Sequence, residues 1–318
     1  MDASSNAKRV VQYEHTDPSI KLFLHHESPE VVFGNGSWNE GPCYFPASRT
    51  LVWSDIPNDR LMRFDELSGS VHVFRQPSMH SNGNTVDRQG RLITCEHGAR
   101  RVTRTEFDGT LTTLAEHHDG KPLNSPNDAV VKSDGSLWFS DPTYGIDSDY
   151  FGNRATREQA GSHVYRVPAE GGAPEAVITT MGQPNGLAFS SDETRLYVVD
   201  TARTGGADLA CHIRHFDIRP NERPIDRGVL AEATVGLFDG IRVDDQDRIW
   251  AGAGDGVHCY GPDGRLLGKI LMDVPVINLC FGGPKRNVLY MCTPHQLLRL
   301  PVRARGQNPF LPPGGTAA

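Results

Sequence analysis

Residues 184–199, PNGLAFSSDETRLYVV, contain the pattern that decides the fold: an amide side chain and a glycine, a short apolar run, a turn and a second apolar run. Two short apolar runs on either side of a Ser-Asp turn are typical of a β-hairpin. The same pattern recurs along the chain, and each copy opens on an oxygen-bearing anchor residue. The anchors are Glu40, Asn82, Asn127, Asn185, Asp239 and Asn278, and the second apolar run begins 10 or 11 residues after each. Six copies in one phase indicate a structural repeat.

The spacing of the anchors predicts the architecture. They follow one another at intervals of 42, 45, 58, 54 and 39 residues, which is the length of a four-stranded unit. Six such units around one axis form a six-bladed β-propeller, an all-β fold. We therefore expect a single domain over residues 1–318. In it, residues 1–39, with strand-like runs at 22–24 and 31–33, close the ring, and residues 303–318 form an irregular tail.

Composition favours a small molecule as the ligand. The 318 residues include 32 Lys and Arg against 39 Asp and Glu, a formal net charge of −7, which argues against nucleic acid or an anionic membrane surface as partner. The first residues, MDASSNAKRV, lack the apolar core of a secretory signal. No apolar run approaches the about 18 residues of a transmembrane helix. We therefore expect a cytoplasmic protein that binds neither nucleic acid nor a membrane.

The phase of the repeat brings the anchors together. The first strand of each propeller blade lines the central channel, so the loops that enter these strands meet at one mouth. Oxygens of Asp, Glu and Asn around one axis suit a hard cation such as Ca²⁺, and Zn²⁺ or Mn²⁺ could also occupy such a site. Asn-Gly is also a common turn, which leaves a purely structural interpretation open for each amide taken alone. Glu40 and Asp239 favour a metal, because a carboxylate on the axis needs a positive partner.

The second strand of each blade returns to the same mouth. Polar residues at its end, such as Glu96-His97, Asp141 and Asp200-Thr201, are predicted to form a rim around the site. Two long insertions, 142–163 and 201–212, begin at this rim and are predicted to cover the site. Asp141 and Tyr144, at the start of the first insertion, are expected to contact the substrate.

Several segments taken together are similar to signature blocks of the family of gluconolactonases and senescence marker protein 30 (regucalcin). They are Glu40-Gly41-Pro42, Ser125-Pro126-Asn127-Asp128, 184–190, 238–244 and 280–283, while 81–83 and 95–98 with Arg101 resemble the bacterial gluconolactonases in particular. The resemblance implies a six-bladed propeller that holds one divalent metal, Ca²⁺ or Zn²⁺ according to member, at Glu40, Asn185 and Asp239. It places Asn127 beside the metal, makes Asp239 the candidate general base, and implies hydrolysis of sugar lactones.

The chemistry of lactone hydrolysis agrees with these residues. A divalent cation can polarise the carbonyl group and activate water, and Asp239 can take the proton of that water. The sequence contains no Gly-x-Ser-x-Gly, His-Glu-x-x-His or nucleotide-binding motif. We therefore predict a lactonase with one divalent ion, with Ca²⁺ as the expected metal. The predicted ligands are Glu40, Asn127, Asn185 and Asp239, and the predicted substrate contacts are Asn82, His97, Asn127, Asp141 and Tyr144.

Two alternatives remain open at this point. A metal-dependent aryl esterase or phosphotriesterase would use the same ion with a more apolar rim. A propeller that binds calcium without catalysis would share the fold, because a fold alone does not fix function.

Overall fold

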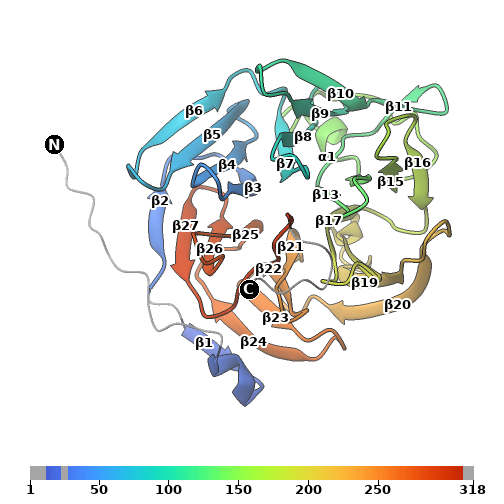
Figure 1. The fold of residues 1–318 in the computed structure, drawn as a ribbon. Coiled ribbons are helices and arrows are strands. Elements are labelled where there is room, and N and C mark those ends of the chain that lie inside the picture. The colour runs from blue at the N-terminus through green and yellow to red at the C-terminus, as the bar shows by residue number, and fades with distance from the viewer. Residues whose placement is uncertain (1–11, 23–27, 311–318) are drawn as a thin grey trace.

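The computed structural model describes residues 12–22 and 28–310, and in it six antiparallel sheets surround a central channel (Figure 1). Each sheet is one blade, and its first strand is the innermost. Blades 1 to 3 consist of β3 (Asn39–Phe45), β4 (Thr50–Asp55), β5 (Arg60–Asp65) and β6 (Val71–Arg75); β7 (Ser81–Val86), β8 (Leu92–Glu96), β9 (Arg101–Thr105) and β10 (Leu111–Ala115); and β13 (Ala129–Val131), β14 (Leu137–Asp141), β15 (His163–Val167) and β16 (Glu175–Ile178). Blade 4 contains β17 (Pro184–Phe189), β18 (Arg195–Asp200), β19 (His212–Asp217) and β20 (Ile225–Glu232). Blade 5 contains β21 (Ile241–Val243), β22 (Ile249–Ala253), β23 (Gly256–Tyr260) and β24 (Leu266–Leu271). The inner three strands of blade 6 are β25 (Asn278–Gly282), β26 (Val288–Cys292) and β27 (Leu297–Pro301). The six-bladed all-β propeller predicted from the repeat is thereby confirmed.

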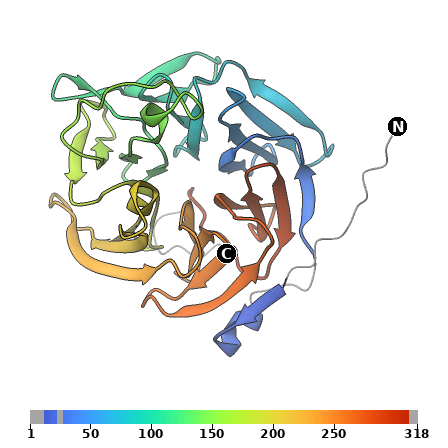
Figure 2. The ribbon, with the colours of Figure 1, turned by 180° about the vertical axis from the view of Figure 1, so that it is seen from behind.

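Strands from the N-terminal part of the chain complete two blades. β2 (Glu30–Phe33) pairs with β27 as the outer strand of blade 6, so that an N-terminal strand and the last strand of the chain share one sheet (Figures 1 and 2). β1 (Gln12–His15) adds a fifth strand to blade 5 beside β24. The strand-like run predicted at 31–33 lies in β2, whereas Leu22 ends a short 3-10 helix, η1 (Pro18–Leu22). Residues 23–24 of the other predicted run and 311–318 of the predicted tail lie outside the described residues.

The anchors occupy a different local structure from the one expected. The sequence placed them in loops, but Glu40, Asn82, Asn185 and Asn278 lie inside the inner strands β3, β7, β17 and β25. The pairing register shifts beside three of these anchors, between Glu40 and Cys43, Ser81 and Asn84, and Pro184 and Leu187. Such bulges turn a side chain out of the regular alternation of a strand and are common beside functional sites. Asn127 and Asp239 instead precede β13 and β21.

Glycines beside the anchors allow neighbouring inner strands to approach closely. A Cβ atom on Gly83 would lie 2.3 Å from the carbonyl oxygen of Asn127, and one on Gly186 would lie 2.5 Å from that of Asp239. No real Cβ atom sits so close to a backbone oxygen, so a side chain at either position would push two blades apart. The Asn-Gly pair at 185–186 is therefore a point of contact between blades and not a turn.

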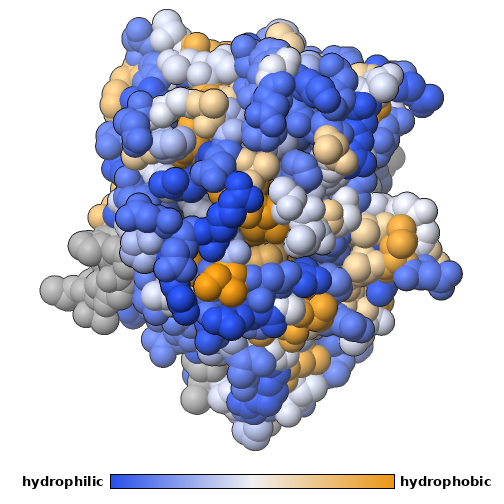
Figure 3. Space-filling model, turned by 90° about the vertical axis from the view of Figure 1, so that its right-hand side faces the viewer, coloured by the Kyte–Doolittle hydropathy of each residue, from blue (hydrophilic) through white to orange (hydrophobic). Residues whose placement is uncertain are grey.

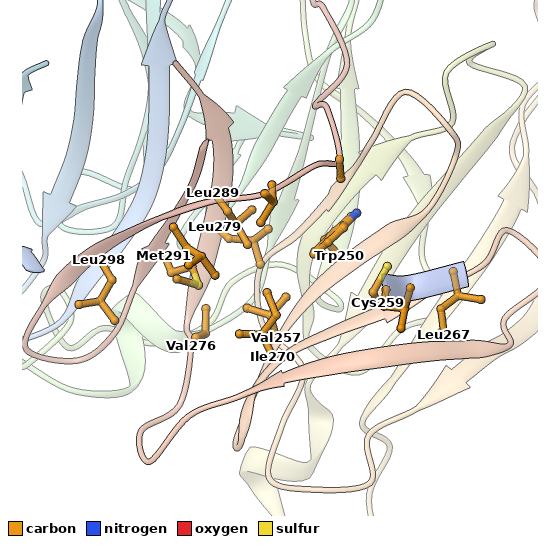
Figure 4. Close-up of a cluster of buried hydrophobic side chains, with 14 residues drawn as sticks. Trp250, Val257, Cys259, Leu267, Ile270, Val276, Leu279, Leu289, Met291 and Leu298 are labelled. Carbon is orange, nitrogen blue, oxygen red and sulfur yellow. The ribbon is translucent and has the colours of Figure 1, made fainter. Parts of the chain in front are cut away.

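Hydrophobic clusters fill the spaces between blades. Figure 4 shows one cluster in which Trp250 and Val257 of blade 5 pack against Leu279 and Met291 of blade 6. All four side chains are buried. Because each cluster is shared by two blades, no blade buries its hydrophobic surface alone, and the ring is stabilised as a unit.

The remaining elements are short. They are β11 (His117–His118), β12 (Lys121–Pro122), α1 (Tyr144–Asp147) and the 3-10 helix η2 (Ala202–Gly205). In the described part of the chain, none of the helices has the length and apolar character needed to cross a membrane. The side of the ring that carries β16 and β20 is mainly hydrophilic, with hydrophobic residues in small groups (Figure 3).

We expect Gly186→Ala to destabilise the fold by about 1–3 kcal/mol or more, because the new methyl group has no space between blades 4 and 5. Gly34→Ala is the matched control, since its Cβ would lie 3.9 Å from the nearest heavy atom, in Val31. Urea unfolding followed by circular dichroism measures both free energies. Equal stability of the two variants would contradict the close-approach argument.

Candidate active site

The anchor side chains gather at one end of the inner strands, around the channel axis. Gly186 N donates to Asp239 O at 3.2 Å, and Asn278 Nδ2 donates to Glu40 Oε2 at 2.8 Å, which joins blade 6 to blade 1. Asp239 is partly exposed. The other anchors are no more than 5 % exposed: Glu40, Asn82, Asn127, Asn185 and Asn278. The predicted metal ligands thus belong to one buried polar cluster.

Glu40 is held so that one of its oxygens remains available. Its Oε2 accepts hydrogen bonds from Gly41 N at 2.6 Å and from Asn278 Nδ2 at 2.8 Å, while Oε1 has no partner among the described residues. Burial raises the pKa of Glu40 to about 7, and the neighbouring carboxylate of Asp128 acts in the same direction. A positive charge beside Oε1 would favour the ionised form.

Asn185 presents its amide oxygen in the same way. Its Nδ2 donates to Thr201 Oγ1 at 3.3 Å, whereas the buried Oδ1 has no partner in the described structure. Burial and the carboxylate of Glu40 raise the pKa of Asp239 well above its usual range. Two nearby carboxylates and an orphaned amide oxygen are a donor set for a cation.

Asn82 is oriented by a chain of hydrogen bonds that starts in the insertion after β14. His97 Nδ1 lies 2.9 Å from Phe151 O, and His97 Nε2 lies 3.2 Å from Asn82 Nδ2. Because the carbonyl oxygen accepts only, we assign the His97 proton to Nδ1, so that Nε2 accepts from Asn82. The buried Oδ1 of Asn82 is then left without a partner in the described residues. His97 thus orients Asn82 in this structure, and the direct substrate contact of His97 stays a prediction.

An ion pair crosses the channel next to this cluster. Arg242 Nη1, from β21 of blade 5, donates to Asp128 Oδ2 at 3.1 Å, and Asp128 directly precedes β13 of blade 3. Asp128 is fully buried, and its charge raises the pKa of Glu40 and of Asp239. Arg242 therefore offsets one of the three negative charges that meet on the axis.

The acidic residues at the rim hold the loops that enter the inner strands. Asp141 accepts from Asn124 N and Ser125 N, at 2.8 Å each, through its two oxygens. Asp200 binds the backbone of residues 182–183 in the same manner, at 2.8 and 2.9 Å. Asp141 is 0 % exposed and holds the backbone of this loop, and its predicted contact with the substrate stays a prediction.

The insertion after β14 reaches over blades 1 and 2. Its Phe151 ring packs edge-on against Trp38, with centroids 5.2 Å apart, and its Asn153 Nδ2 donates to Gly98 O at 3.0 Å. Tyr144, in α1 at the inner side of the ring (Figure 1), hydrogen-bonds Thr201 Oγ1 at the start of the second insertion. The insertions are thus connected to each other through the hydroxyl that also orients Asn185.

The residues present fit a hard divalent cation. Among the described residues, no three or more His, Cys, Asp and Glu side chains are arranged so that they alone could hold a metal ion, so a site of the type used for structural zinc is not present there. The available oxygens belong instead to the side chains of Glu40, Asp239, Asn185 and Asn127. The side-chain amide of Asn127 makes no hydrogen bond in the described structure. The sequence placed Thr201 at the rim and Asn278 among the anchors, but it predicted neither their partners nor a role of Asp128 in the site.

Known proteins resemble this chain along nearly its full length. The sequence profile described as the SMP-30/gluconolactonase/LRE-like region matches residues 38–295. A gluconolactonase from Zymomonas mobilis is 27 % identical over 95 % of this chain and 89 % of the relative, and a pentonolactonase from Haloferax volcanii is 29 % identical over 80 % of each. The solved structure of a gluconolactonase from Xanthomonas campestris is 35 % identical, with a TM-score of 0.87 over 95 % of this chain and 98 % of that one.

The buried His97 predicts a dependence of stability on pH. Burial lowers its pKa from 6.5 to about 4, so the folded protein keeps this ring neutral where the unfolded chain protonates it. Acidification from pH 6.5 to 4 should therefore destabilise the fold, by up to about 1.4 kcal/mol per pH unit for this group. Urea unfolding across this window should give a smaller slope for His97→Gln than for the exposed control His72→Gln. Identical slopes would show that His97 is not held neutral.

Proposed function

This chain belongs to the SMP-30/gluconolactonase/LRE family, and we propose that it hydrolyses sugar lactones with the help of one divalent cation, Ca²⁺ in the first place. The lactonases among its relatives support the reaction class. The single observation that supports the cation is the unpartnered Oδ1 of Asn185 beside two carboxylates of raised pKa. A cytoplasmic location remains a prediction from the sequence.

In this proposal Glu40 Oε1, Asn185 Oδ1 and the carboxylate of Asp239 hold the cation, with Asn127 beside them. When bound, the cation supplies positive charge that polarises the lactone carbonyl and makes a nearby water more acidic. Oxygen-only donors favour Ca²⁺, and Zn²⁺ or Mn²⁺ remain open as the native ion.

Asp239 is proposed as the general base. Its carboxylate takes a proton from the attacking water while the water oxygen bonds to the carbonyl carbon. The ring C–O bond then breaks, and protonated Asp239 returns the proton to the leaving alkoxide, which yields the open hydroxy acid. Asn82 Oδ1 and the Asn127 amide are available for substrate hydroxyl groups.

We expect Asp239→Asn to lower turnover by about 10²–10⁴-fold with metal saturating, because an amide cannot accept the proton of water. Asp263→Asn, at an exposed outer turn, is the matched control. Metal content and the urea midpoint are measured on the same samples. Near-normal turnover of a metal-loaded Asp239 variant would make this residue a ligand only. The next candidates for the base would then be Asp141, His97 and Glu40.

Removal of the cation should abolish lactone hydrolysis, and added Ca²⁺ should restore it. A pH-stat assay with D-glucono-1,5-lactone, a pentonolactone, an aryl acetate and a phosphotriester tests substrate class on one metal-loaded preparation. Preference for the aryl ester or phosphotriester would favour the esterase alternative. Calcium binding without turnover of any substrate would favour the non-catalytic alternative.

A further inference from the structure

The channel contains a cavity at the end opposite the anchors. Its volume is about 660 Å³, and the distal halves of all six inner strands, β3, β7, β13, β17, β21 and β25, line it. The turns that leave these strands complete its wall, among them those at Arg88, Asp245 and Arg286. This volume lies within the range of small-molecule sites in proteins.

The segment 303–310, after the last strand, borders this cavity. Asp245 N donates to Arg305 O at 2.8 Å, and Gly306 N donates to Arg286 O at 2.8 Å. Gln307 Nε2 reaches Phe189 O, in the inner strand of blade 4, at 3.2 Å. These contacts connect the segment to three turns and strands of the ring, so it forms a fixed part of the cavity wall.

The wall carries more positive than negative charge. Four arginines and two acids line the cavity: Arg88, Arg242, Arg286, Arg305, Glu193 and Asp245. Arg242 is paired with Asp128 at 3.1 Å, and Glu193 is paired with Lys132 at 3.1 Å. Of the other lining arginines, Arg88 donates to the carbonyl oxygen of Pro309, while Arg286 and Arg305 remain with Asp245 as the second lining carboxylate. The chain as a whole, in contrast, has a net charge of −7.

Arg286 and Arg305 differ from the other arginines that line the cavity. Neither side chain makes an ion pair or hydrogen bond within the described residues, and the hydrogen bond from Gly306 N to Arg286 O keeps the two segments adjacent. Arg286 is partly exposed and Arg305 is exposed, so both guanidinium groups are accessible to a ligand. Guanidinium groups bind carboxylate and phosphate oxygens through paired N–H donors.

We propose that this cavity binds a small anion bearing carboxylate or phosphate groups, at a site separate from the lactone site. Arg286 and Arg305 supply the recognising charges, and the apolar residues of the inner strands surround the body of the ligand. The Arg242–Asp128 ion pair lies between this cavity and the anchor cluster, so the two sites occupy opposite ends of one channel.

Isothermal titration calorimetry on the metal-loaded protein tests the proposal. Succinate serves as the dicarboxylate probe, and sulfate stands in for a phosphate group. At low ionic strength we expect saturable binding of at least one probe, weakened about tenfold or more in Arg286→Gln/Arg305→Gln, which removes two charge-assisted contacts. The matched control is Arg219→Gln/Arg223→Gln, which removes the same charge from exposed positions of blade 4.

Each outcome of the titration either supports or overturns the anion site. Weaker binding in the cavity variant alone supports the site, and the probe that responds identifies carboxylate or phosphate chemistry. Absence of binding to the wild-type protein overturns the proposal, as does equal affinity in all variants. Binding that disappears when the metal is chelated places the anion at the anchor cluster and also overturns it. Circular dichroism confirms that the variants are folded.

Discussion

The close contact between inner strands, made possible by glycines beside the anchors, is the constraint on which the rest of this structure depends. At Gly83 and Gly186 the neighbouring strand lies where a side chain would begin, and the glycine N–H donates to the carbonyl oxygen of the next anchor. This spacing keeps the channel narrow enough for side chains from different blades to meet. A ring with alanine at these positions would be wider, and its polar residues would no longer share one axis.

Because the channel is narrow, the charged side chains along its axis lie close enough to affect one another. Glu40, Asp128 and Asp239 bring three carboxylates together, and the structure offsets only part of that charge with Arg242. Burial of the remaining negative charge costs free energy in the absence of a cation. The same arrangement therefore supports the proposal of a divalent ion at this cluster, because such an ion would offset that charge.

The residues around the cluster are of two kinds. Some have unpartnered oxygen atoms that a ligand can bind, and others hold these residues in position. Asn82 and Asn185 each have an unpartnered amide oxygen, because His97 and Thr201 engage the nitrogen side of these amides. Asp141 has both oxygens engaged by backbone N–H groups. Acidic side chains at the rim thus set the conformation of the loops, and amides on the inner strands are the groups free to bind.

The sequence by itself determined the number of blades, the phase of the strands and the set of anchors, because these depend on a local pattern that is repeated six times. It did not determine that the anchors lie at bulges within strands, nor which amide atom faces the axis. Those features depend on contacts between distant residues, such as Asp128 with Arg242 and His97 with Phe151. Packing of separate blades creates these contacts, and no local pattern specifies them. The backbone partners of Asp141 could not be predicted from the sequence for the same reason.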